Sequence, residues 1–200
     1  LQRLTGALRV MDSPHRVVLV AYERLDGWCE RFGRRHGDYR RDTAGGSVRL
    51  VAPDGAVAEF DDAAPPDRFG LILVRRGGYA IGLAVGGRLD ASKCGTRYVQ
   101  GKTKAGGWSQ QRYARRRANQ ASDLAGAAGE AIRRVLGDVG PLPTYGGGDR
   151  RLVEASVEAS RVDTVALAER WLDVPDPRYA VLVDAVEQAR SVSIGLNALA

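Results

Sequence analysis

Two amide side chains and a glycine pair stand close together in the middle of the chain, within the sequence GKTKAGGWSQQRYARRR at residues 101–117. Gly106 and Gly107 lack a Cβ atom, so the backbone can approach a partner closely at this point. Gln110 and Gln111 follow, and each amide donates and accepts hydrogen bonds without carrying charge. These residue types suit a polar segment that comes into close contact with a partner.

Cationic side chains lie on both sides of these residues. Between residues 91 and 122 the sequence has no aspartate or glutamate, and its lysines and arginines give the segment a formal charge of +8. The whole chain carries +6, so the remaining residues sum to −2 and the basic character is local. Such a cluster is typical of nucleic-acid binding, although short basic runs also occur on solvated helices. The cations are Lys93, Arg97, Lys102, Lys104, Arg112, Arg115, Arg116 and Arg117.

The composition is that of a globular protein, with 44% hydrophobic and 27% charged residues in a chain of 200. This length predicts a single domain over residues 17–200, preceded by an N-terminal segment, residues 1–16. Cys29 and Cys94 stand far apart, and only two histidines accompany them, so we expect no metal site and no cofactor. No apolar run approaches the length of a membrane span and no signal peptide is evident, so we expect a cytoplasmic monomer without membrane contact.

The first half of the chain is predicted to consist mainly of strands. Pro53-Asp54-Gly55 is a strong hairpin signal, and the later glycine pairs indicate turns in an antiparallel meander. Leucine and aromatic residues at helical spacing predict one early helix that ends at Gly37. The expected strands are residues 17–20, 48–52, 56–60, 69–74, 79–85 and 97–100, and the expected helix is residues 23–36.

The second half is predicted to be mainly helical, which makes the fold class α+β or mixed α/β. A long helix is expected to begin at Ser109 as its N-cap and to end at Gly137, with an apolar stripe along its later half. The sequence Gly146-Gly147-Gly148-Asp149 is interpreted as a tight strand-to-helix turn in preference to a phosphate site. The other expected elements are strands 142–145 and 192–196 and helices 151–160, 164–172 and 179–189.

Three quoted stretches carry a resemblance to a known family: GKTKAGGWSQQRYARRR at a loop-to-helix junction, TYGGGDRRLVEAS, and the helix PDPRYAVLVDAVEQA. From about Val17 onward the chain resembles the actinobacterial VLRF family, which are release-factor-like peptidyl-tRNA hydrolases related to the eukaryotic Vms/ANKZF ribosome-quality-control factors. The resemblance implies the RNase H-like fold of the catalytic middle domain of eukaryotic and archaeal class I release factors. It also implies partners, namely the large ribosomal subunit with its rRNA and a P-site peptidyl-tRNA.

The resemblance further implies roles for individual residues. Class I release factors carry a contiguous Gly-Gly-Gln, whereas Trp108 and Ser109 intervene here, so two glutamines compete for the catalytic place. The match to the VLRF segment favours Gln110 as the residue that positions water, with Gly106 and Gly107 permitting close approach. The expected RNA contacts are Lys102, Lys104, Trp108, Arg112, Arg115, Arg116 and Arg117.

Two other classes of function stay open from the sequence. One is a non-enzymatic RNA-binding or ribosome-binding module, in which the glutamines are merely polar contacts. The other is a metal-dependent nuclease, which needs clustered carboxylates to hold two metal ions. Asp26, Asp61 and Asp62 are the candidates for such a cluster, but nothing in the sequence places them near the basic segment.

Overall fold

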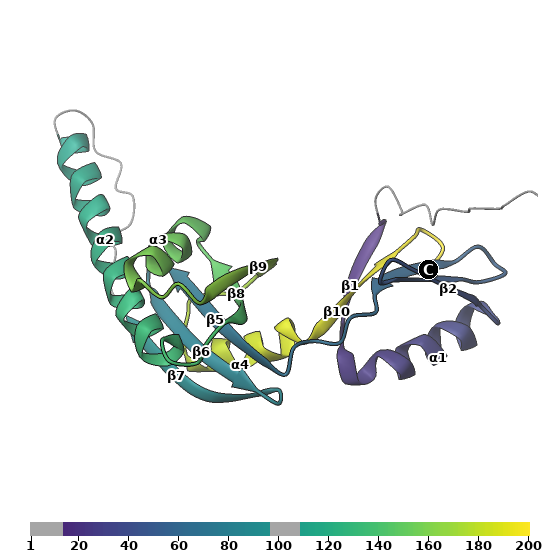
Figure 1. The fold of residues 1–200 in the computed structure, drawn as a ribbon. Helices are drawn as coiled ribbons and strands as arrows, with labels where there is room; N and C mark the ends of the chain where they lie inside the picture. Colours follow the sequence, from purple (N-terminus) through teal and green to yellow (C-terminus); the bar gives the residue numbers. More distant parts are fainter. Residues whose placement is uncertain (1–13, 97–108) are drawn as a thin grey trace, which may run out of the picture. The chain divides into compact units, whose positions relative to one another are not determined.

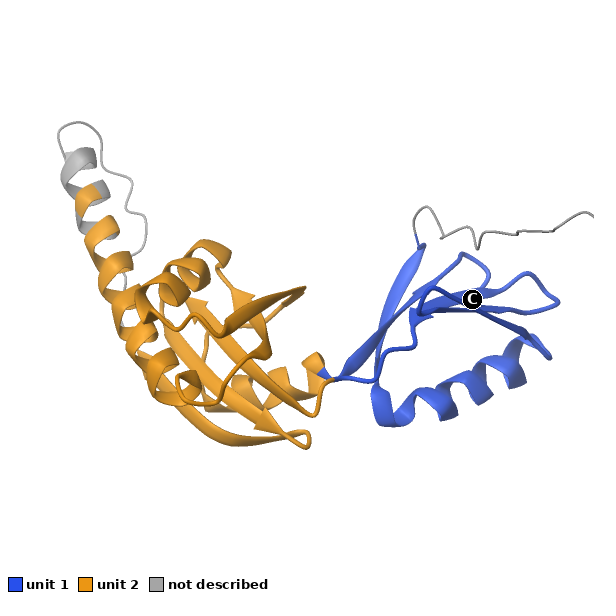
Figure 2. Ribbon diagram, viewed as in Figure 1, with its two compact units in different colours: residues 1–65, 190–200 blue, residues 66–189 orange. Residues whose placement is uncertain are grey.

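The computed structural model describes residues 14–96 and 109–200, and these fall into two compact units (Figures 1 and 2). Unit 1 comprises the described residues up to Pro65 together with Arg190–Ala200, and unit 2 comprises Pro66–Ala189. Unit 2 is therefore an insertion between two strands of unit 1. The expectation of a single domain over residues 17–200 stays a prediction.

Unit 1 is a five-stranded antiparallel sheet with one helix packed on it. The strand order is β1-β10-β4-β3-β2, so the C-terminal strand lies between the first and the fourth. Alternate residues of β1, β10, β4 and β3 face the helix and enclose Phe32 and Cys29. The elements are β1 (Arg16–Ala21), a 3-10 turn η1 (Tyr22–Arg24), α1 (Leu25–His36), β2 (Arg40–Ala44), β3 (Ser47–Val51), β4 (Val57–Asp61) and β10 (Ser191–Leu196).

The predicted hairpin at Pro53-Asp54-Gly55 is confirmed, and the side chain of Asp54 and the backbone of Gly55 explain why the turn forms here. The Asp54 carboxylate accepts a hydrogen bond from the backbone N–H of Ala56 at 2.9 Å, and Gly55 adopts a φ of 88°. His36 Nδ1 lies 2.8 Å from the other Asp54 oxygen, which connects the end of α1 to the turn. The backbone hydrogen bond, followed by the one to His36, holds the pKa of Asp54 below its ordinary value.

Unit 2 is a mixed five-stranded sheet with helices on both faces, which confirms the predicted α+β class. Strands β5, β6 and β7 form the predicted antiparallel meander, and β8 and β9 continue the sheet in parallel with β5, in the order β7-β6-β5-β8-β9. The elements are β5 (Arg68–Arg75), β6 (Gly78–Val85), β7 (Arg88–Thr96), α2 (Ser109–Leu136), β8 (Leu142–Gly148), α3 (Arg150–Ser160), β9 (Val165–Leu172) and α4 (Tyr179–Ala189).

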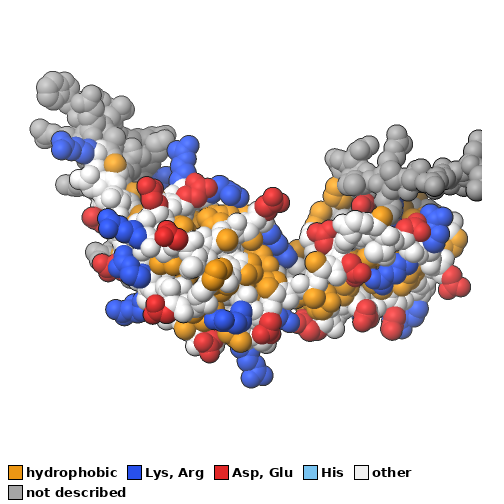
Figure 3. All heavy atoms as spheres, viewed as in Figure 1, with side chains coloured by type: hydrophobic (Ala, Val, Ile, Leu, Met, Phe, Trp, Pro, Cys, Tyr) orange, Lys and Arg blue, Asp and Glu red, His pale blue; other side chains and the backbone are white. Residues whose placement is uncertain are grey.

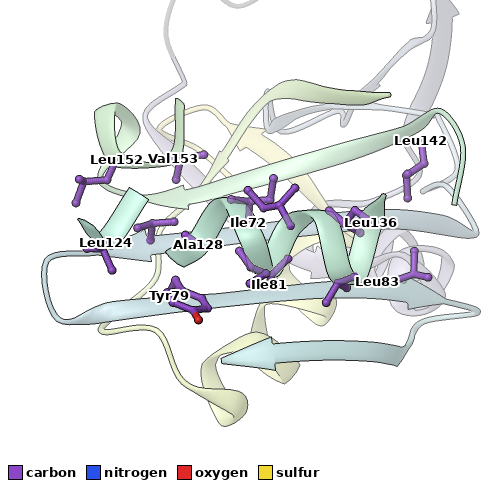
Figure 4. Close-up of a cluster of buried hydrophobic side chains, with 14 residues drawn as sticks. Ile72, Tyr79, Ile81, Leu83, Leu124, Ala128, Leu136, Leu142, Leu152 and Val153 are labelled. Carbon is purple, nitrogen blue, oxygen red and sulfur yellow. The ribbon is translucent and has the colours of Figure 1, made fainter. Parts of the chain in front are cut away.

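The core of unit 2 has two layers, one on each side of the sheet. Helices α2 and α3 pack on one face, where Ile72 and Ile81 are fully buried (Figure 4). Helix α4 packs on the other face, against Phe69, Leu71 and Leu73, which are also fully buried. Strand β5 is buried on both faces because it lies at the centre of the sheet.

One predicted element is wrong. Residues 164–172 were expected to form a helix, but they form strand β9, which pairs in parallel with β8 from Leu142 opposite Val165 to Gly147 opposite Leu172. The segment Ala-Leu-Ala-Glu favours a helix locally, but pairing with β8 and packing of Val165 and Leu167 on the core override that preference. The result is a β-α-β unit made of β8, α3 and β9.

Two further strands differ from the sequence-based expectation. Strand β2 was not predicted, because it is a polar edge strand whose residues are mostly exposed. The third strand of the meander was placed at residues 97–100, which lie outside the described residues, whereas β7 occupies Arg88–Thr96. Like β2, β7 is an edge strand with few β-branched residues, so it gives little signal.

Both cysteines are free thiols in this fold. Cys29 is buried in the core of unit 1, and Cys94 lies partly buried on β7. Burial raises the pKa of each thiol, so both remain protonated at neutral pH and act as packing residues. Among the described helices, none is long and apolar enough to cross a bilayer.

Candidate RNA-facing site

Helix α2 carries the candidate catalytic residue Gln110 and the candidate RNA-binding arginines near its N-terminal end. With 28 residues, the helix is about 42 Å long at 1.5 Å per residue. Leu124 is the first buried residue among those of its side chains that the structure describes, and Ala128, Ile132 and Leu136 continue the buried stripe. Ala121, one turn earlier, already packs against this core, whereas Arg115, Ala118 and Asn119 are exposed. The part of α2 before Ala121, called here its unpacked half, is about 18 Å long, and Figure 1 shows the helix extending past the sheet of unit 2.

The packed half of α2 is held by the sheet and by α3. The fully buried side chains Leu124, Ile132 and Leu136 lie on the β6 and β5 side of the helix (Figure 4). On the α3 side, Gly129 comes so close that a Cβ atom there would lie 2.9 Å from the backbone of Ala159 and Ser160. This packing fixes the direction of α2, so the unpacked half has a rigid base.

The structure places only part of the predicted site. Gln110, Arg112, Arg116 and Arg117 lie in the first turns of α2, but their side chains are outside what the structure describes. The Arg115 side chain is described, and it is exposed. Lys102, Lys104, Gly106, Gly107 and Trp108 lie outside the described residues. Basic side chains also follow the later part of α2, with acidic ones among them (Figure 3).

The carboxyl ends of β5, β8 and β9 lie at the same end of unit 2 as the start of α3. This follows from the parallel register, in which Val74 opposes Gly148 and Gly146 opposes Trp171. In the core close-up, Leu124 and Leu152 lie at one end of the cluster and Leu136 at the other (Figure 4). The start of α3 therefore lies beside the point where α2 leaves the core.

The Gly146-Gly147-Gly148-Asp149 sequence is a tight strand-to-helix turn, as predicted. Gly148 has a φ of 89°, and a Cβ atom there would lie 2.4 Å from the Val74 carbonyl oxygen, so glycine is required. The Asp149 carboxylate caps α3 by accepting hydrogen bonds from Arg151 N at 3.1 Å and Leu152 N at 3.3 Å. Because this carboxylate occupies the free amides, the helix start does not offer them to a phosphate.

Replacing Asp149 by alanine is expected to lower the free energy of unfolding by about 1 kcal/mol, because two backbone amides of α3 lose their acceptor. Asparagine is an equally good N-cap, so Asp149→Asn should remain close to the wild type. Urea unfolding followed by circular dichroism measures both. Equal destabilisation by the two variants would show that the negative charge, not the cap, is what matters.

Two side chains that contact each other at this turn were not predicted from the sequence. The guanidinium carbon of Arg150 lies 4.2 Å from the centre of the Trp171 ring, a cation–π contact between the first residue of α3 and the end of β9. Trp171 is itself fixed, because its Nε1 donates to the Gly148 carbonyl oxygen at 3.2 Å. The two residues are far apart in sequence, and the helix wrongly expected at 164–172 concealed their contact.

The carboxylates considered for a nuclease do not belong to this region. Asp26, Asp61 and Asp62 are all residues of unit 1, and Asp62 pairs with Arg41 at 3.3 Å. Within the described ranges 14–96 and 109–200, histidines, cysteines and carboxylates form no group of three that could hold a metal ion. The described residues therefore give the nuclease alternative no metal site.

The described fold is an α+β unit with a long helix, and the basic run in the first turns of that helix is of the kind that is typical of proteins that bind a polyanion. The chain belongs to the Actinobacteria/chloroflexi VLRF1 release factor family, whose family model matches residues 67–195. The resemblance noted in the sequence is thus confirmed, and the chain is a translation protein of the release-factor class. The matched residues include all of unit 2 from Asp67 onward and most of β10.

One similar solved structure is the crystal structure of an archaeal translation termination factor, aRF1. The two chains share 18% identity with a TM-score of 0.42, over 84% of this chain and 53% of that one. This chain therefore spans about half the length of the archaeal factor. No curated protein matches the sequence.

Proposed function

We propose that this protein is a ribosome-dependent peptidyl-tRNA hydrolase that releases nascent chains from stalled ribosomes or large subunits, as part of ribosome-associated quality control. The observation that carries the proposal is the match to a release-factor family over residues 67–195, which contain the whole Gly-Gly, glutamine and arginine segment and the helix that bears it. The partners in this proposal are the rRNA of the large subunit and a P-site peptidyl-tRNA.

The proposed reaction needs few catalytic groups from the protein. Peptidyl-tRNA is a reactive ester, and its hydrolysis needs a water molecule held at the carbonyl carbon and polar donors where negative charge develops on the oxygen. In the proposed mechanism the Gln110 amide orients this water, and Gly106 and Gly107 let the backbone approach the ester. A neutral amide suits a crowded cavity, because a charged group there is costly to remove from water.

The geometry of α2 supports delivery of such a group into a narrow space. Gln110 precedes the first described buried residue, Leu124, by about 21 Å of helix at 1.5 Å per residue. A single helix is only about 10–12 Å wide with its side chains. It can therefore enter a cavity that is too narrow for the five-stranded sheet of unit 2. Packing of the other half of α2 on the sheet and on α3 fixes the direction in which this end of the helix extends.

The cations of the segment are proposed to bind RNA phosphates. Lys102 and Lys104 precede the glycine pair, and Arg112, Arg115, Arg116 and Arg117 follow it, so the catalytic amide lies between two sets of positive charge. Phosphate contacts of this kind position a protein on RNA without reading sequence. Trp108 is proposed to stack on an unpaired base.

Release of labelled peptide from peptidyl-tRNA on purified large subunits tests the proposal. The wild-type protein should release the peptide at a rate well above the spontaneous hydrolysis of the ester. Binding to large subunits without release would contradict the enzymatic function and would favour the RNA-binding module instead.

Replacing Arg115 and Arg116 by alanine is expected to reduce the salt dependence of binding to large subunits. Each phosphate contact that is lost should lower the slope of log K against log salt by about 0.7 to 0.9, because fewer counterions are released. Arg134→Ala, an exposed arginine near the other end of the same helix, is the matched control. Equal slopes for the double variant and this control would contradict the assignment of Arg115 and Arg116.

A further inference from the structure

We propose that Arg150, held on Trp171, is a second contact for the RNA backbone at the base of the unpacked half of α2. This inference rests on the proposed function, and it extends the RNA-facing surface beyond the segment 101–117 to the turn between β8 and α3. The ligand at Arg150 is a backbone phosphate of the same RNA that contacts the arginines of α2.

Arg150 is exposed and lacks an anionic partner. Within the described ranges, the ion pairs include Arg41–Asp62 and Arg190–Glu23, and none of them involves Arg150. The Glu154 carboxylate is one helical turn away, yet the guanidinium lies over Trp171 instead. Its charge is therefore available to a ligand.

The contact with Trp171 holds Arg150 in place before any ligand binds. The indole is fixed by its hydrogen bond to the Gly148 carbonyl and lies against Gly146, where a Cβ atom would be 2.3 Å from the ring. An arginine stacked on a fixed ring has lost most of its side-chain freedom, but stacking does not use the N–H donors in the plane of its guanidinium. Binding a phosphate then costs less conformational entropy than it does for a free surface arginine.

The carboxylates and arginines around Arg150 leave its charge unneutralised. Asp149 is the nearest carboxylate in sequence, but its oxygen is occupied by the amides of Arg151 and Leu152. Asp176 lies near Gly77, beside the β5–β6 turn, where Arg76 is also exposed. At the same turn, the buried Nε of Arg75 has no hydrogen-bond partner among the described residues, so a cationic donor lies unpaired at this end of the sheet.

The position of Arg150 matches the path of an RNA bound along α2. Arg150 precedes Leu152, which lies at the same end of the core as Leu124, where α2 leaves it (Figure 4). Arg115 lies nine residues before Leu124, about 13 Å further along the helix. Both arginines therefore lie toward the same end of unit 2, so one RNA bound along α2 can contact both.

Binding of Arg150→Ala to purified large ribosomal subunits, measured at several salt concentrations, tests the inference. We expect Kd at low salt to rise about 5- to 10-fold and the log–log slope to fall by about 0.7 to 0.9, because one charge-assisted contact is lost. The matched control is Arg161→Ala, an exposed arginine at the other end of α3, which should bind like the wild type. Thermal unfolding verifies that both variants fold.

The outcomes separate this inference from the proposed function. If Arg115→Ala lowers the slope while Arg150→Ala behaves like Arg161→Ala, the inference is overturned and RNA binding along α2 stands. If the wild-type protein does not bind large subunits, the proposed function fails and the inference fails with it. A lower slope for Arg150→Ala with unchanged Arg161→Ala supports the second contact.

Discussion

Replacement of Gln110 by alanine is expected to lower the rate of peptide release from large subunits by about 10²- to 10³-fold, the usual cost of removing one preorganised polar group at a reacting carbonyl. Binding to large subunits should remain close to the wild type, because the amide carries no charge and the arginines are untouched. Single-turnover release and subunit binding, measured on the same preparations, give the two quantities.

Gln111→Ala is the matched control for this prediction. The two residues are adjacent in α2, so their side chains point about 100° apart around the helix and only one of them is expected to face the ester. Release that falls with Gln111→Ala and not with Gln110→Ala would transfer the catalytic role to Gln111. Loss of binding together with release in Gln110→Ala would show that the residue holds the ribosome and does not act in hydrolysis.

Much of the fold could be predicted because the decisive signals are local. The turn Pro53-Asp54-Gly55 specifies its hairpin through the Asp54 hydrogen bond and the positive φ of Gly55. The apolar stripe of α2 corresponds to the buried row from Leu124 to Leu136, and the helix ends immediately before Gly137. In each case neighbouring residues carry the information.

The errors arise where distant residues decide the structure. Strand β9 becomes a strand because β8 offers a pairing edge and the core accepts its apolar residues, and neither fact is visible in the local sequence. The edge strands β2 and β7 bury little, so they lack the alternating pattern that identifies a strand. The sheet of unit 1 gives no local signal of its composition either, because β10, at the end of the chain, completes the sheet that β1 begins.

The candidate site shows the same contrast. The basic, glycine and glutamine segment is continuous in sequence, so its composition alone points to it. The pairing of Arg150 with Trp171 depends on the register between β8 and β9, which places Trp171 opposite Gly146. A lone arginine and a lone tryptophan give no signal until that register is known.

The close packing of α2 on α3 leads to a prediction with a large effect on stability. Gly129→Leu is expected to lower the free energy of unfolding by about 3 kcal/mol, because the side chain meets the α3 backbone at Ala159 and Ser160 and overpacks the contact. The variant should also release peptide more slowly, because a displaced α2 no longer holds Gln110 in position to orient the water at the ester. Urea unfolding and the release assay measure the two effects.

Gly126→Leu is the control, because it makes the same substitution one turn earlier on the same helix. A Cβ atom at Gly126 would have no neighbour within 4 Å, and leucine favours a helix over glycine by roughly 0.5–1 kcal/mol, so this variant should be slightly more stable than the wild type. The opposite signs follow from packing alone, since the chemical change is identical. If Gly129→Leu also stabilised the protein, α2 would not be held against α3, and the rigid base proposed for delivery of Gln110 would be lost.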